Sequence, residues 1–240
     1  MQTGWNENRA LLCGTVAGEP VLSHENHGVS YDVFPLSVPR LSGAEDRLNV
    51  VAARPLLTDC PLAPGDRVEV QGEVRSFNNR TGPGSRLVIT LFARSLSPTR
   101  AEPANCLELS GVLCKPPILR RTPLGREICD LMLAVNRKYG RADYLPCIAW
   151  GTLAQRCGGL HVGDGVKLEG RLQSRSYQKV VDGVTQDRTA FEVSVMHLEP
   201  VSPGRRRASG IHSNRSVLMW RPESKDSSLH AVFPRPWPCA

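Results

Sequence analysis

The stretch Val166-Lys-Leu-Glu-Gly-Arg-Leu-Gln-Ser-Arg-Ser-Tyr177 decides the fold class of this chain, because its residue types alternate. Apolar or small residues occupy every second position, and the positions between them carry Lys167, Glu169, Arg171, Gln173, Arg175 and Tyr177. Alternate side chains of a β-strand point to opposite faces, so a period of two predicts a strand. We expect one long strand with an apolar inner face and a basic outer face that ends in an aromatic ring.

A second alternating run lies upstream, from Tyr144 to Trp150. One parity holds Tyr144, Ile148 and Trp150, and the other holds Leu145, Cys147 and Ala149. Aromatic and branched side chains suit a strand that is half-buried. We expect one face of this strand to meet a core and the other to offer its rings to a ligand or a subunit.

Three segments contain or adjoin these runs: L-M-L-A-V-N-R-K-Y at 131–139, A-D-Y-L-P-C-I-A-W-G-T-L-A at 142–154 and V-G-D-G-V-K-L-E-G-R-L-Q-S-R-S-Y at 162–177. These segments resemble the bacterial single-stranded DNA-binding protein (SSB) family, whose members have the OB-fold. They follow the order and the spacing of that family, and the resemblance covers about Leu107 to Pro200.

The resemblance places the base-stacking aromatic positions of the family on Tyr139, Tyr144, Trp150 and Tyr177. OB-folds that bind single strands combine such rings with a basic groove that follows the backbone. Core packing is the alternative role of each ring, and neighbouring charges favour stacking most for Tyr139 and Tyr177. Four cations beside the rings are expected to meet phosphates, with solvated surface charge as the alternative: Arg137, Lys138, Arg171 and Arg175.

The first part of the chain repeats the same plan. Leu62–Gly72 matches Leu160–Gly170 as a turn followed by a strand of the same parity, and residues 32–40 line up with 130–137 within one residue. The first copy lacks most of the expected rings. The alignment sets Arg54 against Trp150 and Leu48 against Tyr144, which leaves Phe77 as the ring near the end of its long strand.

We therefore predict an all-β chain of two tandem five-stranded OB-fold barrels with a disordered C-terminal tail. The predicted parts are a diverged OB-fold domain at 6–98, a linker at 99–106, an SSB-like OB-fold domain at 107–200 and a basic tail at 201–240. In the second domain we expect strands at 107–114, 126–137, 143–150, 166–177 and 188–198, with a short helix at 152–157. A helix after the third of five strands is the OB-fold order.

The tail concentrates the positive charge of the chain. Residues 201–240 hold seven bases and two acids, which is +5 of the overall +7, whereas residues 1–100 are neutral. The tail is rich in Ser, Arg and Pro without periodicity, which predicts disorder. Arg205 to Arg207 either attract phosphates or are merely solvated. The SSB resemblance implies an acidic tip that recruits other proteins, but this chain ends in Phe-Pro-Arg-Pro-Trp-Pro-Cys-Ala.

The sequence contains no pattern typical of an enzyme or a cofactor site. It has no Gly-rich phosphate loop, no nucleophile elbow and no H-E-x-x-H. Its eight cysteines include no C-x-x-C pair, so we predict free, mostly buried thiols and no metal site. We expect a cytoplasmic, nucleoid-associated bacterial protein without a membrane partner, since we find neither a signal peptide nor an apolar run of about 20 residues.

Two functions remain open from the sequence. The leading one is sequence-independent binding and protection of single-stranded DNA in replication, recombination or repair, with replication or repair proteins as possible partners. The alternative is a primosome or replication-restart type interaction module with weak nucleic-acid affinity, which the ring-poor first copy favours. RNA also stays open, because stacking does not report the sugar. By analogy with SSB relatives, two barrels per chain predict a homodimer with four OB-folds.

Overall fold

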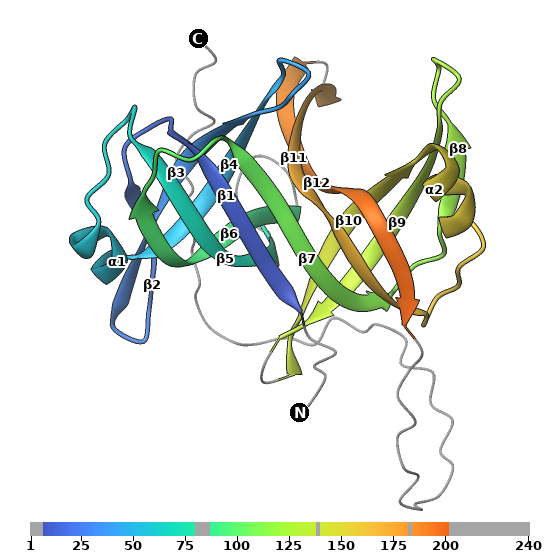
Figure 1. Cartoon of the computed structure of the whole chain (residues 1–240), viewed down its shortest axis with the longest axis horizontal. Coiled ribbons are helices and arrows are strands. Elements are labelled where there is room, and N and C mark those ends of the chain that lie inside the picture. The colour runs from blue at the N-terminus through green and yellow to red at the C-terminus, as the bar shows by residue number, and fades with distance from the viewer. Residues whose placement is uncertain (1–6, 80–86, 138–139, 182–183, 202–240) are drawn as a thin grey trace, which may run out of the picture.

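The computed structural model describes residues 7–79, 87–137, 140–181 and 184–201, and these residues form twelve strands and two helices. The strands build two OB-fold barrels that lie side by side, the first blue to teal and the second green to orange in Figure 1. The expected all-β class with two tandem barrels is therefore confirmed. The predicted tail at 201–240 lies, apart from its first residue, outside the described residues.

The first barrel closes through five strands. Its elements are β1 (Asn8–Val16), β2 (Val21–Asn26), β3 (Val29–Pro39), β4 (Glu45–Ala53), α1 (Arg54–Asp59), β5 (Arg67–Asn78) and β6 (Leu87–Pro98). The strand β1 pairs with both β3 and β5, and β4 pairs with β3. The antiparallel β5–β6 hairpin and a short parallel pairing of β4 with β6 complete the ring. The short strand β2 forms a hairpin with β3.

The second barrel repeats this topology. Its elements are β7 (Ala104–Leu113), β8 (Ile118–Arg121), β9 (Glu127–Asn136), β10 (Ala142–Trp150), α2 (Gly151–Cys157), β11 (Gly165–Val181) and β12 (Val184–Val201). The strand β7 pairs with β9 and β11, and a parallel pairing of β10 with β12 closes the ring. The predicted helix after the third barrel strand is α2.

Each barrel is filled by the inner parity of its strands. In the first barrel Phe34, Leu48 and Leu91 have no exposed surface, and in the second Leu133 and Leu145 have none. These side chains come from strands that are far apart in the sequence, so their burial stabilises the closed barrel rather than any single hairpin.

The strands β1 and β7 join the two barrels. They run antiparallel at the centre of the molecule (Figure 1). Asn8 lies opposite Leu109, and Asn105, which is the repeat counterpart of Asn8, lies opposite Leu12. The two domains are therefore related by an approximate two-fold axis that passes between β1 and β7.

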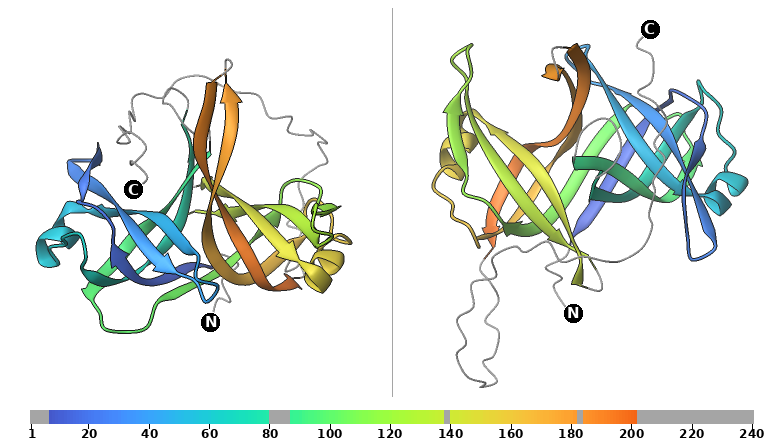
Figure 2. Two further views of the ribbon diagram at one scale, coloured as in Figure 1. Left: turned by 90° about the horizontal axis from the view of Figure 1, so that it is seen from above. Right: turned by 180° about the vertical axis from the view of Figure 1, so that it is seen from behind.

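The long strands β5 and β11 each contact the opposite domain. The strand β5 packs against β10, and β11 packs against β4. Figure 2 shows the β11–β12 hairpin beside the blue strands of the first barrel. The register of each long strand shifts at a glycine, Gly72 in β5 and Gly170 in β11. A Cβ atom at Gly170 would overlap the carbonyl oxygen of Ser194, so this bulge, which bends the strand, requires glycine.

Several details of the fold differ from the sequence-based expectation. The strand β7 begins at Ala104, so the end of the expected linker 99–106 belongs to a strand that pairs with β1. The strand β8 was not predicted, because its four residues are all exposed and show no alternation. Gln173 was expected to face outward but is buried, because β11 packs against β4 there and the Gln173 amide donates to Glu192 (2.7 Å).

Candidate nucleic-acid interface

Strand β10 presents two aromatic rings on its outer face. Tyr144 is 50% exposed and Trp150 is 39% exposed, whereas Leu145 and Cys147 on the other parity are buried in the core. The expected division of this strand into a core face and a ring-bearing face is therefore observed at both rings but not at Ile148, which was expected to share their face and is only 6% exposed. At about 3.3 Å per residue the two rings stand about 20 Å apart along the strand, so each offers a separate stacking surface.

Strand β11 carries the second group of predicted residues. The Arg175 guanidinium lies over the Tyr177 ring, 5.6 Å from its centroid, and Arg175 is exposed while Tyr177 is half-buried. A cation held against a ring can meet a phosphate beside a stacked base. Arg171 lies closer to the barrel and is half-buried. Its Nε is buried and has no hydrogen-bond partner among the described residues.

The rings of the first barrel are arranged differently. Phe77 on β5 is half-buried. His24 stacks on Tyr31 with ring centroids 4.9 Å apart, and Tyr31 packs against Phe92 at 5.6 Å. Burial lowers the pKa of His24, which favours its neutral form. The rings of His24, Tyr31 and Phe92 cover one another. They therefore offer less free ring surface than Tyr144 and Trp150 do.

Arg137 forms an ion pair instead of pointing freely into solvent. Its Nε donates to the Asp143 carboxylate at 2.7 Å, its Nη2 donates to the other carboxylate oxygen, and Nη2 also donates to the Ser76 carbonyl oxygen at 3.0 Å. The Asp143 side chain is fully buried. Arg137 therefore neutralises a buried charge, and its predicted contact with a phosphate stays a prediction.

An equivalent ion pair occurs in the first domain. The same interval separates Arg40 from Arg137 and Asp46 from Asp143, and Arg40 donates to Asp46 (2.7 Å) and to the Ser174 carbonyl oxygen (3.1 Å). Both arginines therefore reach across to the other domain. Arg137 of the second domain contacts Ser76 on β5 of the first, and Arg40 of the first contacts Ser174 on β11 of the second.

These matched ion pairs correct the alignment of the two copies by one residue. Tyr144 follows Asp143 as Arg47 follows Asp46, so the counterpart of Tyr144 is the exposed Arg47 rather than the fully buried Leu48. By the same interval and strand register, Trp150 corresponds to Ala53 rather than Arg54. Outward parity at the Tyr144 position could have revealed this shift in the sequence.

Other predicted residues fall outside the described part of the chain. These are Lys138, Tyr139 and the Arg205 to Arg207 cluster. Conversely, sequence reasoning missed Arg120 of β8, which forms an ion pair with Asp130 of β9 (2.5 Å). Asp130 lies opposite Ile148 of β10, the strand that carries Tyr144 and Trp150, so Arg120 neutralises an acid on the neighbouring strand. The turn Thr122-Pro-Leu-Gly125 was the sequence signal for the hairpin that contains Arg120.

The cysteines of the described residues are free thiols, and most of them are buried. Burial raises the pKa of the Cys147 thiol, and it raises the pKa of Cys157 to about 11. Both thiols are therefore protonated and poorly nucleophilic near neutral pH. In the described part of the chain, no three His, Cys, Asp or Glu side chains gather in a way that could hold a metal ion. None of the described helices is long and apolar enough to cross a membrane.

The architecture defines an OB-fold protein, and the second barrel exposes two aromatic rings on one strand. Residues 104–201 match the model of the single-strand binding protein family. The chain is 33% identical over 140 residues to single-stranded DNA-binding protein 2 of Listeria innocua, a match that covers 53% of this chain and 83% of that protein. This chain belongs to the single-strand binding protein family.

Further comparisons extend the likeness to both domains. Single-stranded DNA-binding protein A of Bacillus subtilis is 33% identical over 107 residues, which is 42% of this chain and 62% of that protein. The crystal structure of the wild-type single-stranded DNA binding protein from Thermus aquaticus matches with a TM-score of 0.68 at 23% identity. That match covers 85% of this chain and 97% of the Thermus chain, so the fold of both barrels is shared.

Proposed function

We propose that this protein binds single-stranded DNA without sequence preference and protects it during replication, recombination or repair. The observation that carries this proposal is the pair of exposed rings, Tyr144 and Trp150, on one face of β10. Stacked bases are typically worth about 1–3 kcal/mol each on alanine substitution of the ring. Family membership, and relatives that are named single-stranded DNA-binding proteins, support DNA as the ligand.

The second barrel carries most of the affinity in this proposal. Its Arg175–Tyr177 pair adds a cation beside a ring, and Arg171 lies on the same strand. Tyr139 occupies a stacking position of the family and Lys138 directly precedes it, and both are proposed as further contacts. The first barrel has Arg47 and Ala53 where the second has Tyr144 and Trp150, and we propose that Phe77 contributes less than those rings.

The protein acts by binding rather than by catalysis, and we place it in the bacterial cytoplasm at the nucleoid, where single-stranded DNA is exposed. Two barrels per chain support a homodimer with four OB-folds, by analogy with SSB relatives. Light scattering that shows a stable monomer at working concentration would contradict this assembly. Replication and repair proteins are the proposed protein partners.

The test is a titration of the full-length protein with oligo-dT, oligo-U and a duplex of equal length at one fixed salt concentration. We expect oligo-dT to bind most tightly and the duplex to bind least, because only unpaired bases can stack on Tyr144 and Trp150. Equal affinity for oligo-U would make RNA an additional ligand, since rings do not read the sugar. Weak binding of all three would favour a protein-interaction module instead.

A further inference from the structure

The β5–β6 hairpin of the first domain contacts the second domain directly at the backbone of Tyr144. The Ser76 hydroxyl on β5 accepts a hydrogen bond from the Tyr144 amide nitrogen (2.7 Å), and the Ser76 amide donates to the Asp143 carboxylate. Ser76 is only 7% exposed and Asp143 is fully buried. One serine of the first domain therefore holds two consecutive residues of β10 in the second domain.

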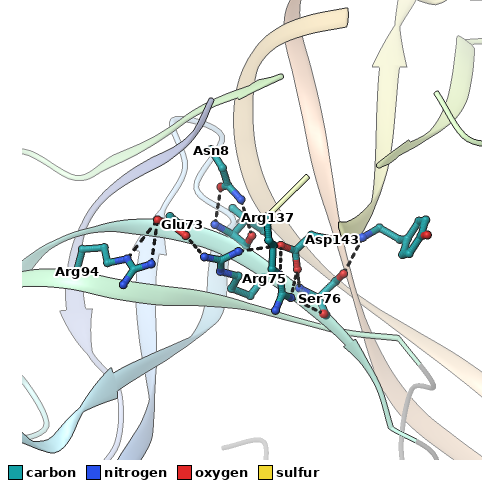
Figure 3. Close-up of polar contacts among 9 residues, drawn as sticks. Asn8, Glu73, Arg75, Ser76, Arg94, Arg137 and Asp143 are labelled. Carbon is teal, nitrogen blue, oxygen red and sulfur yellow. Dashed lines mark hydrogen bonds and ion pairs between the residues drawn. The ribbon is translucent and has the colours of Figure 1, made fainter. Parts of the chain in front are cut away.

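A chain of alternating charges supports this contact (Figure 3). Besides Arg137, the Asp143 carboxylate accepts from the Arg75 guanidinium (3.2 Å), and Arg75 also pairs with Glu73. Glu73 in turn pairs with Arg94 at 3.1 Å. The buried carboxylate is thus fully compensated by two guanidinium groups and a backbone amide, which makes a buried charge tolerable.

Strand β5 is also held close to Ser76 by a side chain of β1. The Asn8 side chain makes two hydrogen bonds to the backbone of Val74, one to its carbonyl oxygen (2.9 Å) and one from its amide nitrogen (2.8 Å). Val74 lies two residues before Ser76 on the same strand. The position of Ser76 is therefore set by the first barrel and not by a freely moving loop.

The equivalent contact, in which Ser174 of the second domain meets the first domain, includes fewer charged groups. There the Ser174 hydroxyl accepts from the Arg47 amide (3.0 Å), and the Ser174 amide donates to Asp46 (2.7 Å). The residue before Ser174 is Gln173, where the residue before Ser76 is Arg75, and Gln173 bonds to Glu192 instead of Asp46. The ring-bearing position, Tyr144, thus receives the more highly charged of the two contacts.

We propose that Ser76 and Asp143 are positioning residues of the nucleic-acid interface, through which the first domain holds the Tyr144 ring ready to stack on a base. A ring on a backbone that is already ordered loses less conformational freedom on binding, which raises affinity without a new contact to the ligand. The first domain then contributes to binding although it has few free ring surfaces of its own. This inference rests on the proposed binding of single-stranded DNA.

The test is a double-mutant cycle in the full-length protein, with oligo-dT affinity as the readout. Ser76→Ala should weaken binding about 2- to 10-fold, the range expected for ordering one side chain. It should weaken binding no further in a Tyr144→Ala background, because its effect acts through that ring. Ser76→Thr retains the hydroxyl and should restore affinity. Arg75→Gln, which copies the Gln173 position, should show the same dependence on Tyr144.

The matched control is Ser174→Ala, which removes the equivalent hydroxyl on the opposite side. The effect of Ser174→Ala on oligo-dT affinity, whatever its size, should be additive with the effect of Tyr144→Ala. The reason is that the Ser174 hydroxyl contacts the backbone of Arg47. Thermal unfolding of each variant checks that the protein is folded at the assay temperature. If Ser76→Ala and Arg75→Gln leave affinity unchanged, or weaken it equally with and without the Tyr144 ring, the inference is wrong. Wild-type protein that fails to bind oligo-dT would instead remove the proposed function on which the inference rests.

Discussion

Replacing the buried carboxylate at either inter-domain contact should destabilise the protein, and the loss should be larger at Asp143 than at Asp46. Both side chains are buried, at 0% and 1% exposure. Breaking a buried ion pair by removing one partner typically costs about 3–5 kcal/mol. Asp143→Asn and Asp46→Asn keep the side-chain volume but remove the charge, so each should lower the free energy of unfolding by about that amount.

The difference between the two variants comes from Arg75. Asp143 accepts from Arg75 as well as from Arg137, whereas Asp46 accepts from the single guanidinium of Arg40. The Arg75 bond is longer, at 3.2 Å, and Arg75 is shared with Glu73. We therefore assign this extra charged hydrogen bond about 1.5 kcal/mol, the low end of the range for hydrogen bonds to charged groups.

Urea unfolding followed by circular dichroism measures both losses, and the Arg75→Gln background supplies the control. In that background the two asparagine substitutions should cost the same, because the Asp143 contact then resembles the Asp46 contact. The reasoning would be refuted if the two substitutions lowered the free energy of unfolding equally in the wild-type background. It would also be refuted if the larger loss at Asp143 persisted in the Arg75→Gln background.

Three further predictions concern the binding face and the thiols. Trp150→Ala should weaken oligo-dT binding about 5- to 150-fold, which corresponds to about 1–3 kcal/mol, and Phe77→Ala should weaken it less; a titration in which Phe77→Ala costs as much would disprove the division between the barrels. Arg175→Ala should lower the slope of log affinity against log salt by about 0.7 without abolishing binding, and an unchanged slope would exclude a phosphate contact. Burial raises the pKa of the Cys147 thiol, so at pH 8 a thiol reagent followed by peptide mapping should label the exposed Cys106 quickly and Cys147 only on unfolding; fast labelling of Cys147 in the native protein would contradict its burial.

Alternation predicts much of this fold, because most barrel strands have one core face. The parity of β10 predicted both the exposed Tyr144 and the buried Leu145. Alternation fails at Gln173, which is buried where β11 packs against β4 of the other domain, and no local pattern reports such packing. The alignment of Leu48 with Tyr144 was wrong by one residue for a different reason. The two copies share few identical residues in this segment, so the sequence alone did not fix their register.

The inter-domain contacts were not predicted, although part of their signal is present in the sequence. Both copies place an arginine and an aspartate at the same spacing, Arg40 with Asp46 and Arg137 with Asp143. Sequence reasoning assigned Arg137 to phosphate binding because it adjoins a ring-bearing segment. Only the fold shows that Ser76, far away in the chain, completes the contact with Asp143.

The most direct test of the central claim, that rings of the second barrel hold the DNA, is an oligo-dT titration at about 1 M salt, where attraction between exposed charges is largely screened. Three proteins are compared: the wild type, a variant that lacks residues 202–240, and the double variant Trp150→Ala with Tyr177→Ala. We predict that a residual affinity survives removal of the basic tail and is lost when the two rings are removed. Residual affinity that disappears with the tail and persists without the rings would contradict the account.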